Sequence, residues 1–146
     1  MTRTREQVIW DFVQDWLEKA KGDLRAAEHL LDLEPGDYFT SAFHAQPAAE
    51  KYLKAFLVRH QIPFPKTHDI QYLLELVSQA DPAVTEELSS AVMLTPFGVE
   101  FRYPGELLVH LELAQQSVEE ANRVQKVILE SLEDYLSQGR PSDPAS

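Results

Sequence analysis

The 146-residue sequence contains no cysteine and no long hydrophobic run. Without cysteine, the protein cannot form disulfides, thiolate metal sites or a cysteine nucleophile. No stretch reaches the roughly 18 apolar residues that a membrane-spanning helix needs. The N-terminal sequence MTRTREQVIWDF also lacks the apolar block of a secretory signal. We therefore expect a cytoplasmic protein that does not insert into a membrane.

Basic residues are scarce: 13 Lys and Arg stand against 24 Asp and Glu, which gives a formal net charge of −11. An acidic protein is repelled by nucleic acid at long range, which argues against broad, non-specific binding to RNA or DNA. Residues 37–70 differ from the rest because they hold three acids, four bases and three histidines. This slightly cationic segment is where an anion-binding site is expected.

Apolar residues at spacings of three and four predict long helices over residues 5–33, 37–60 and 106–136. Pro47 interrupts the second pattern. Since a proline inside a helix removes a backbone hydrogen bond, we expect either a kink near residues 43–45 or a helix that begins near Gln46.

Two shorter helices are expected between the second and the last long helix. Thr67 looks like the N-cap of the first, and Asp81-Pro82 is a cap followed by a proline at the first helical position. The inward-facing residues of the first short helix are expected to be Ile70, Leu73, Leu74 and Val77. The second should end near residue 93, before an ordered loop over residues 95–105.

No stretch shows the period-two alternation of a strand. An all-α fold, an antiparallel four-helix up-and-down bundle with a short extra helix, is therefore the simplest way to bury these apolar stripes. We expect one domain over residues 1–137, followed by a polar, flexible C-terminal tail over residues 138–146.

The second predicted helix and the segment after it read SAFHAQPAAEKYLKAFLVRHQIPFPKTHDIQYLL. This stretch strongly resembles the central motif of the HEPN domain family, named for nucleotide binding in higher eukaryotes and prokaryotes. The resemblance covers about residues 8–136 and includes FRYPG before the last helix. The matching residues of the central motif are Phe43-His44, Gln46, residues 49–55, Pro63, residues 67–70 and Leu73-Leu74.

The resemblance implies a small helical bundle that pairs as a homodimer. It also implies a nucleotide-binding or interaction module that is the partner of a minimal nucleotidyltransferase in a toxin–antitoxin-like pair. No membrane partner and no cofactor are expected.

The same resemblance gives an alternative function, a metal-independent ribonuclease toxin. Ribonucleases of the family use an arginine followed, after four to six residues, by a histidine at the start of the last helix. Here Arg102 is in the right place, but seven residues separate it from His110, so this motif is not matched.

Three residues near the start of the last helix are candidates for chemistry. Arg102 has a planar donor fork suited to phosphate, and a histidine such as His110 transfers protons near neutral pH. Tyr103 is a candidate either for contact with a base or for covalent modification in a toxin-like system. The alternatives are an Arg102 that pairs with an acid and a partly buried, hydrogen-bonded His110.

A second candidate site lies in the predicted second helix. Lys51 and Lys54 are one turn apart, and His44 is seven residues before Lys51, so the three share roughly one face that could hold a nucleotide phosphate. The alternative is a solvated face on which Glu50 pairs with Lys54. His68 is either a nucleotide-pocket residue or a structural residue that bonds back to the preceding helix. The histidine spacings predict no metal site.

Overall fold

All regular secondary structure in the described part of the chain is helical. The structure, a computed structural model, describes residues 2–95 and 110–143, and no strand occurs within these ranges. The all-α fold class is thereby confirmed. In chain order the elements are α1 (Arg5–Asp32), α2 (Tyr38–Arg59), α3 (Ile70–Val77), α4 (Pro82–Glu87), the 3₁₀ helix η1 (Ser89–Leu94), α6 (Leu111–Ser131) and α7 (Glu133–Gln138).

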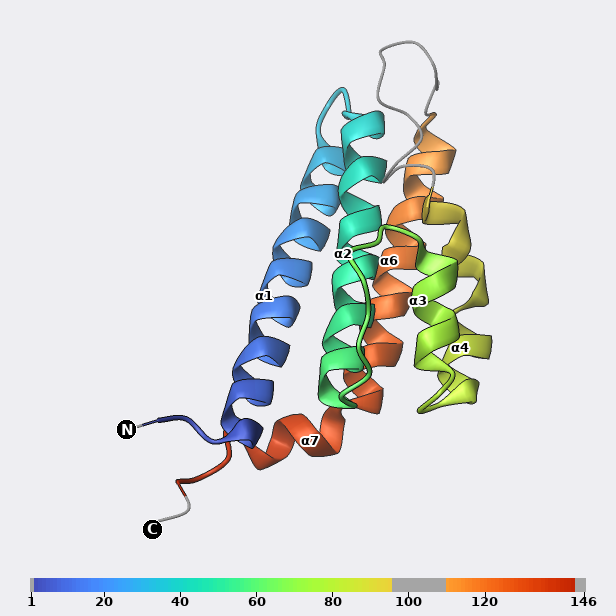
Figure 1. Cartoon of the computed structure of the whole chain (residues 1–146). Helices are drawn as coiled ribbons and strands as arrows, with labels where there is room; N and C mark the ends of the chain where they lie inside the picture. The colour runs from blue at the N-terminus through green and yellow to red at the C-terminus, as the bar shows by residue number, and fades with distance from the viewer. Residues whose placement is uncertain (1, 96–109, 144–146) are drawn as a thin grey trace.

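The long helices α1 and α2 lie side by side in opposite directions, and α6 packs along α2 (Figure 1). The segment of residues 60–69 runs back along α2 before α3 begins, so α2 and α3 point the same way. We call this segment the return segment. It brings residues near the start of α3 onto the middle of α2, where the candidate site lies.

The core is centred on α2, which buries small side chains as well as large ones. Small side chains let neighbouring helices approach closely, and the hydroxyl of Ser41 donates a hydrogen bond to the Ala27 carbonyl of α1. The fully buried core side chains of α2 are Ala42, Ala45, Ala48, Ala49, Leu53, Ala55 and Leu57, and Tyr52 and Phe56 are only 1% exposed.

Pro47 lies inside α2 without ending it, because α2 is one helix from Tyr38 to Arg59. The prediction of a helix that begins near Gln46 is therefore wrong. Asp37 caps the first turn by accepting a hydrogen bond from the Thr40 backbone N–H at 3.2 Å, and Ser41 is bonded to α1. These two contacts hold the first turn of α2, which precedes Pro47, in helical form.

The N-cap of α3 is Asp69, so the prediction that Thr67 caps this helix is wrong. The Asp69 carboxylate accepts a hydrogen bond from the Tyr72 backbone N–H at 3.3 Å. Thr67 acts one step earlier, because its hydroxyl accepts from the Asp69 N–H at 3.1 Å. Thr67 and Asp69 both precede α3, and each accepts one backbone hydrogen bond at the start of this helix. The predicted inward-facing residues of α3 are confirmed as buried: Ile70, Leu73, Leu74 and Val77.

Replacing Asp69 with alanine should lower the free energy of unfolding by about 1 kcal/mol, because the first turn of α3 loses its cap. Urea denaturation measures the change. Asp69→Asn is the matched control, since asparagine is an equally good cap and should stay close to the unsubstituted protein. An alanine variant as stable as the asparagine variant would contradict the assigned cap.

The expected short helix near residue 81 begins as predicted, with Asp81 as N-cap and Pro82 in the first turn of α4. The expected last helix is divided in two, because α6 ends at Ser131 and α7 follows after Leu132. Residues 106–109 of that expectation lie outside the described residues, as does most of the loop expected over residues 95–105.

The chain after α7 is attached to the start of α1 as far as it is described. Gln7 donates hydrogen bonds to the Pro141 carbonyl at 3.0 Å and to the Asp143 carboxylate at 2.9 Å. Arg140 forms an ion pair with Asp11 at 3.0 Å. Residues 140–143 therefore return to the body of the domain, although they belong to the predicted tail.

None of the helices in the described ranges is long and apolar enough to cross a membrane.

Candidate functional site

The centre of α2 holds an ion pair that is almost completely buried. Glu50 and Lys54 are 4% and 6% exposed, and the Lys54 ammonium donates to the Glu50 carboxylate. The ammonium also lies 5.4 Å from the centre of the Trp16 ring and 5.8 Å from that of Phe64. The pairing of Glu50 with Lys54 was one of the sequence-based interpretations and is confirmed. That interpretation placed the pair on a solvated helix face, whereas both side chains are buried.

The ion pair also holds the return segment against α2. Lys54 donates to the Thr67 carbonyl at 3.2 Å, and His68 Nδ1 lies 3.0 Å from a Glu50 carboxylate oxygen. Gln46 completes the network by donating to that same oxygen at 2.8 Å and to the His68 carbonyl at 3.2 Å. His68 therefore bonds back to the preceding helix, as its structural interpretation predicted.

These partners keep Glu50 ionised. Burial by itself raises the pKa of Glu50, but the hydrogen bonds from Lys54, His68 and Gln46 outweigh burial and lower the pKa from its ordinary 4.5. Lys54 and Glu50 each satisfy the charge of the other. The chemical role of this group is therefore to bind the return segment, since its cation already has an anionic partner.

The network makes the protein less stable in acid. The contribution of ionised Glu50 is present above pH 4.5 and is lost as the pH falls through the lowered folded-state pKa, because the unfolded chain then binds more protons than the folded one. The double variant Glu50→Gln/Lys54→Met should therefore show a flatter fall of the unfolding free energy below pH 4.5. Urea denaturation at a series of pH values measures this, and an unchanged slope in the double variant would contradict it.

A second cluster joins α1 to α2 nearer the start of α2. Asp23 of α1 forms an ion pair with Lys51, and its other carboxylate oxygen lies 3.3 Å from His44 Nδ1. The side chains of His44 and Lys51 are 34% and 26% exposed. Unlike Lys54, both are therefore accessible to a ligand.

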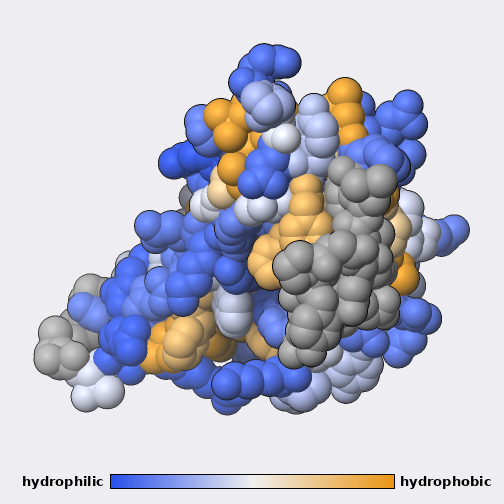
Figure 2. Space-filling view, turned by 90° about the horizontal axis from the view of Figure 1, so that it is seen from above, coloured by the Kyte–Doolittle hydropathy of each residue, from blue (hydrophilic) through white to orange (hydrophobic). Residues whose placement is uncertain are grey.

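Exposed phenyl rings lie beside this second cluster. Phe39 and Phe43 are stacked with ring centres 6.4 Å apart, and they are 37% and 42% exposed. Phe43 also contacts the His44 ring edge-on, at 6.2 Å. We call Phe39, Phe43, His44 and Lys51 the α2 outer surface. Figure 2, which looks onto the end of the bundle where α2 and α6 begin, shows hydrophobic side chains at the surface among hydrophilic ones.

The four predicted phosphate-binding residues that lie in the described ranges thus fall into two groups, each centred on one carboxylate. Lys54 and His68 surround Glu50, whereas His44 and Lys51 surround Asp23. The sequence-based candidates did not include Asp23. Asp23 pairs with residues more than twenty positions away in the sequence. No short-range sequence pattern therefore marks it as part of the site.

His110 is exposed at the N-cap position of α6, and its side chain makes no capping hydrogen bond. The expectation of a partly buried, hydrogen-bonded histidine is therefore wrong. Its neighbour Leu111 is also exposed, at 43%. Arg102 and Tyr103 lie outside the described residues.

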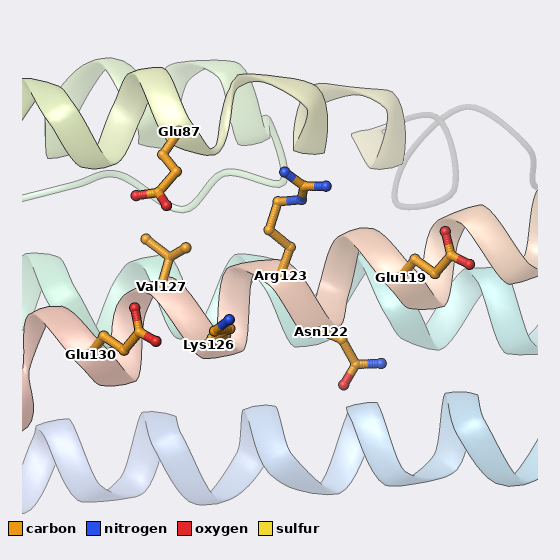
Figure 3. Close-up of a pocket in the computed structure, with 7 residues that line it drawn as sticks. All are labelled: Glu87, Glu119, Asn122, Arg123, Lys126, Val127 and Glu130. Carbon is orange, nitrogen blue, oxygen red and sulfur yellow. The ribbon is translucent and has the colours of Figure 1, made fainter.

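A polar pocket of about 560 Å³ lies elsewhere, between α4 and α6 (Figure 3). Arg123 of α6 extends toward α4 in this view, and Glu87 extends from α4 toward α6. The full lining is Glu87, Glu119, Asn122, Arg123, Lys126, Val127 and Glu130. Its three carboxylates outnumber its two cations, so the lining does not favour an anion, and no sequence-predicted candidate residue belongs to it.

The described part of the chain is thus a helical bundle whose second helix carries a buried Glu–Lys pair that holds the return segment. The HEPN domain family model matches residues 13–134, and the chain belongs to the HEPN domain family. The structure is also similar to the crystal structure of TT1696 from Thermus thermophilus, with a TM-score of 0.67 and 28% sequence identity, over 81% of this chain and 96% of that one. Among curated proteins, none matched.

Proposed function

We propose that the protein is a HEPN module that binds a nucleotide at the α2 outer surface and acts as the partner of a minimal nucleotidyltransferase in a toxin–antitoxin-like pair. The observation that carries the binding proposal is the exposed phenyl pair beside His44 and Lys51. Aromatic rings bind bases by stacking, and an ammonium group binds phosphate. The cation of Lys54 contributes less, because it is buried against Glu50.

Isothermal titration calorimetry with AMP, GMP, CMP and UMP tests nucleotide binding. Phe43→Ala should weaken binding by at least about fivefold, since stacking on an aromatic ring contributes roughly 1–3 kcal/mol per base. Lys51→Ala should weaken it as well. Matched controls are Phe12→Ala and Lys126→Ala, which change an exposed phenyl ring on α1 and an exposed ammonium on α6 without touching the α2 outer surface. Equal affinities in all four variants would contradict the proposed surface.

The proposed assembly is a homodimer that recognises a nucleotidyltransferase. It is supported by the family and by apolar side chains that are exposed outside the α2 outer surface, Leu33 and Leu111. Sedimentation at micromolar concentration should show twice the 16.7 kDa mass of the chain, and a single 16.7 kDa species would contradict the dimer. Co-expression with a minimal nucleotidyltransferase encoded beside its gene should give a complex of fixed stoichiometry.

One observation favours the alternative function, a metal-independent ribonuclease. The His110 side chain is exposed at the start of α6 and makes no capping bond, so its ring is available for proton transfer. In this role Arg102 would stabilise phosphate charge. Incubation with mixed RNA in EDTA tests it: cleavage should fall by about 100-fold or more in His110→Ala and in Arg102→Ala. No cleavage by the unsubstituted protein would exclude this function and leave the binding module.

A further inference from the structure

The contact between His44 and Asp23 fixes which ring nitrogen of His44 carries the proton. The second oxygen of the Asp23 carboxylate forms an ion pair with the Lys51 ammonium. An ionised carboxylate only accepts hydrogen bonds, so the Nδ1 atom of His44, 3.3 Å away, must be the donor. In a neutral imidazole only one nitrogen is protonated, and the Nε2 atom of His44 is then a hydrogen-bond acceptor.

This tautomer decides which part of a nucleotide His44 can bind. A phosphate group presents mainly acceptor oxygens, and two acceptors repel each other, so neutral His44 is a poor phosphate ligand. The donors that a nucleotide sugar offers are its hydroxyl groups. Lys51, which is paired to the same Asp23, is the phosphate-binding cation of the surface, and Phe43 is the ring nearest to His44 for a base.

We propose that His44 Nε2 accepts a hydrogen bond from the 2′-hydroxyl of a ribose, so that the α2 outer surface prefers a ribonucleotide unit to a deoxyribonucleotide unit. This rests on the proposed nucleotide binding and adds its sugar specificity. The 2′-hydroxyl is the group by which a protein distinguishes RNA from DNA at a given position. Asp23 is a positioning residue in this arrangement, because it sets the tautomer and the orientation of the ring without contacting the ligand.

Calorimetry at pH 8 tests the preference with AMP against 2′-deoxy-AMP. The same comparison with single-stranded pentamers of riboadenylate and deoxyriboadenylate separates a free nucleotide from an RNA strand as the source of the ribose. The ribose form should bind about three- to tenfold more tightly, which corresponds to one hydrogen bond.

Two variants connect the preference to the proposed atoms. His44→Ala should bind ribose and deoxyribose forms equally while retaining the stacking and phosphate contacts. Asp23→Asn should also lose the preference, because an amide can donate as well as accept and no longer fixes the tautomer. Lys126→Ala is the control that keeps it. Circular dichroism checks that each variant has the helical content of the unsubstituted protein.

The outcomes separate this inference from the proposed function. Equal affinity of the unsubstituted protein for ribose and deoxyribose probes would overturn the role of His44 and leave nucleotide binding intact. A preference that persists in His44→Ala would overturn it as well. If no probe binds the unsubstituted protein, nucleotide binding itself fails, and the inference fails with it.

Discussion

Replacing Lys54 with alanine should lower the free energy of unfolding by about 3–5 kcal/mol. The substitution leaves the Glu50 carboxylate buried, 4% exposed, without its cation. It also removes the donor to the Thr67 carbonyl, which is a bond between α2 and the return segment. Urea denaturation monitored by circular dichroism measures the change.

The double variant Glu50→Gln/Lys54→Met is the control for this result. A buried ion pair that is replaced as a whole by uncharged groups of similar size often causes little or no loss of stability, because no charge remains uncompensated. The double variant should therefore be markedly more stable than Lys54→Ala. A loss of less than about 1 kcal/mol in Lys54→Ala, the range of an exposed ion pair, would contradict the burial of Lys54.

Phe56→Ala should lower the free energy of unfolding by about 3–5 kcal/mol, because it empties a large site in the core. Phe56 lies on α2, is 1% exposed and contacts the His60 ring at 4.3 Å between ring centres. Phe12→Ala is the matched control: the same atoms are removed from a side chain that is 52% exposed, so its effect should be much smaller. Similar losses in the two variants would contradict the assignment of Phe56 to the core.

The helices were predictable because their signals are local. Apolar spacing gave α1 and α2 to within one or two residues, and Asp81-Pro82 marked the start of α4. The errors fall where two local signals compete. Pro47 suggested a later start for α2, but the Asp37 cap and the Ser41 bond to α1 hold the first turn. The break at Leu132 was not predicted, because the apolar pattern continues through it.

The candidate site was predictable only in part, because its contacts join distant segments. The residue types pointed to His44, Lys51, Lys54 and His68. Their sequence spacing did not show that the first two contact Asp23 and the last two contact Glu50. Asp23 lies on another helix, and the burial of Lys54 depends on Trp16 and Phe64, which come from α1 and the return segment.

The bonds from Gln7 and Asp11 to residues 140–143 have a practical consequence for attaching the protein to other molecules. Both described ends of the chain lie at one end of the bundle, and α2 begins at the opposite end (Figure 1). An affinity tag, a fluorophore or a fused domain joined next to either described end is therefore attached at the end of the bundle opposite to the start of α2, where Phe39 and Phe43 lie. A sensor surface that captures the protein by either terminus leaves the α2 outer surface facing the solution.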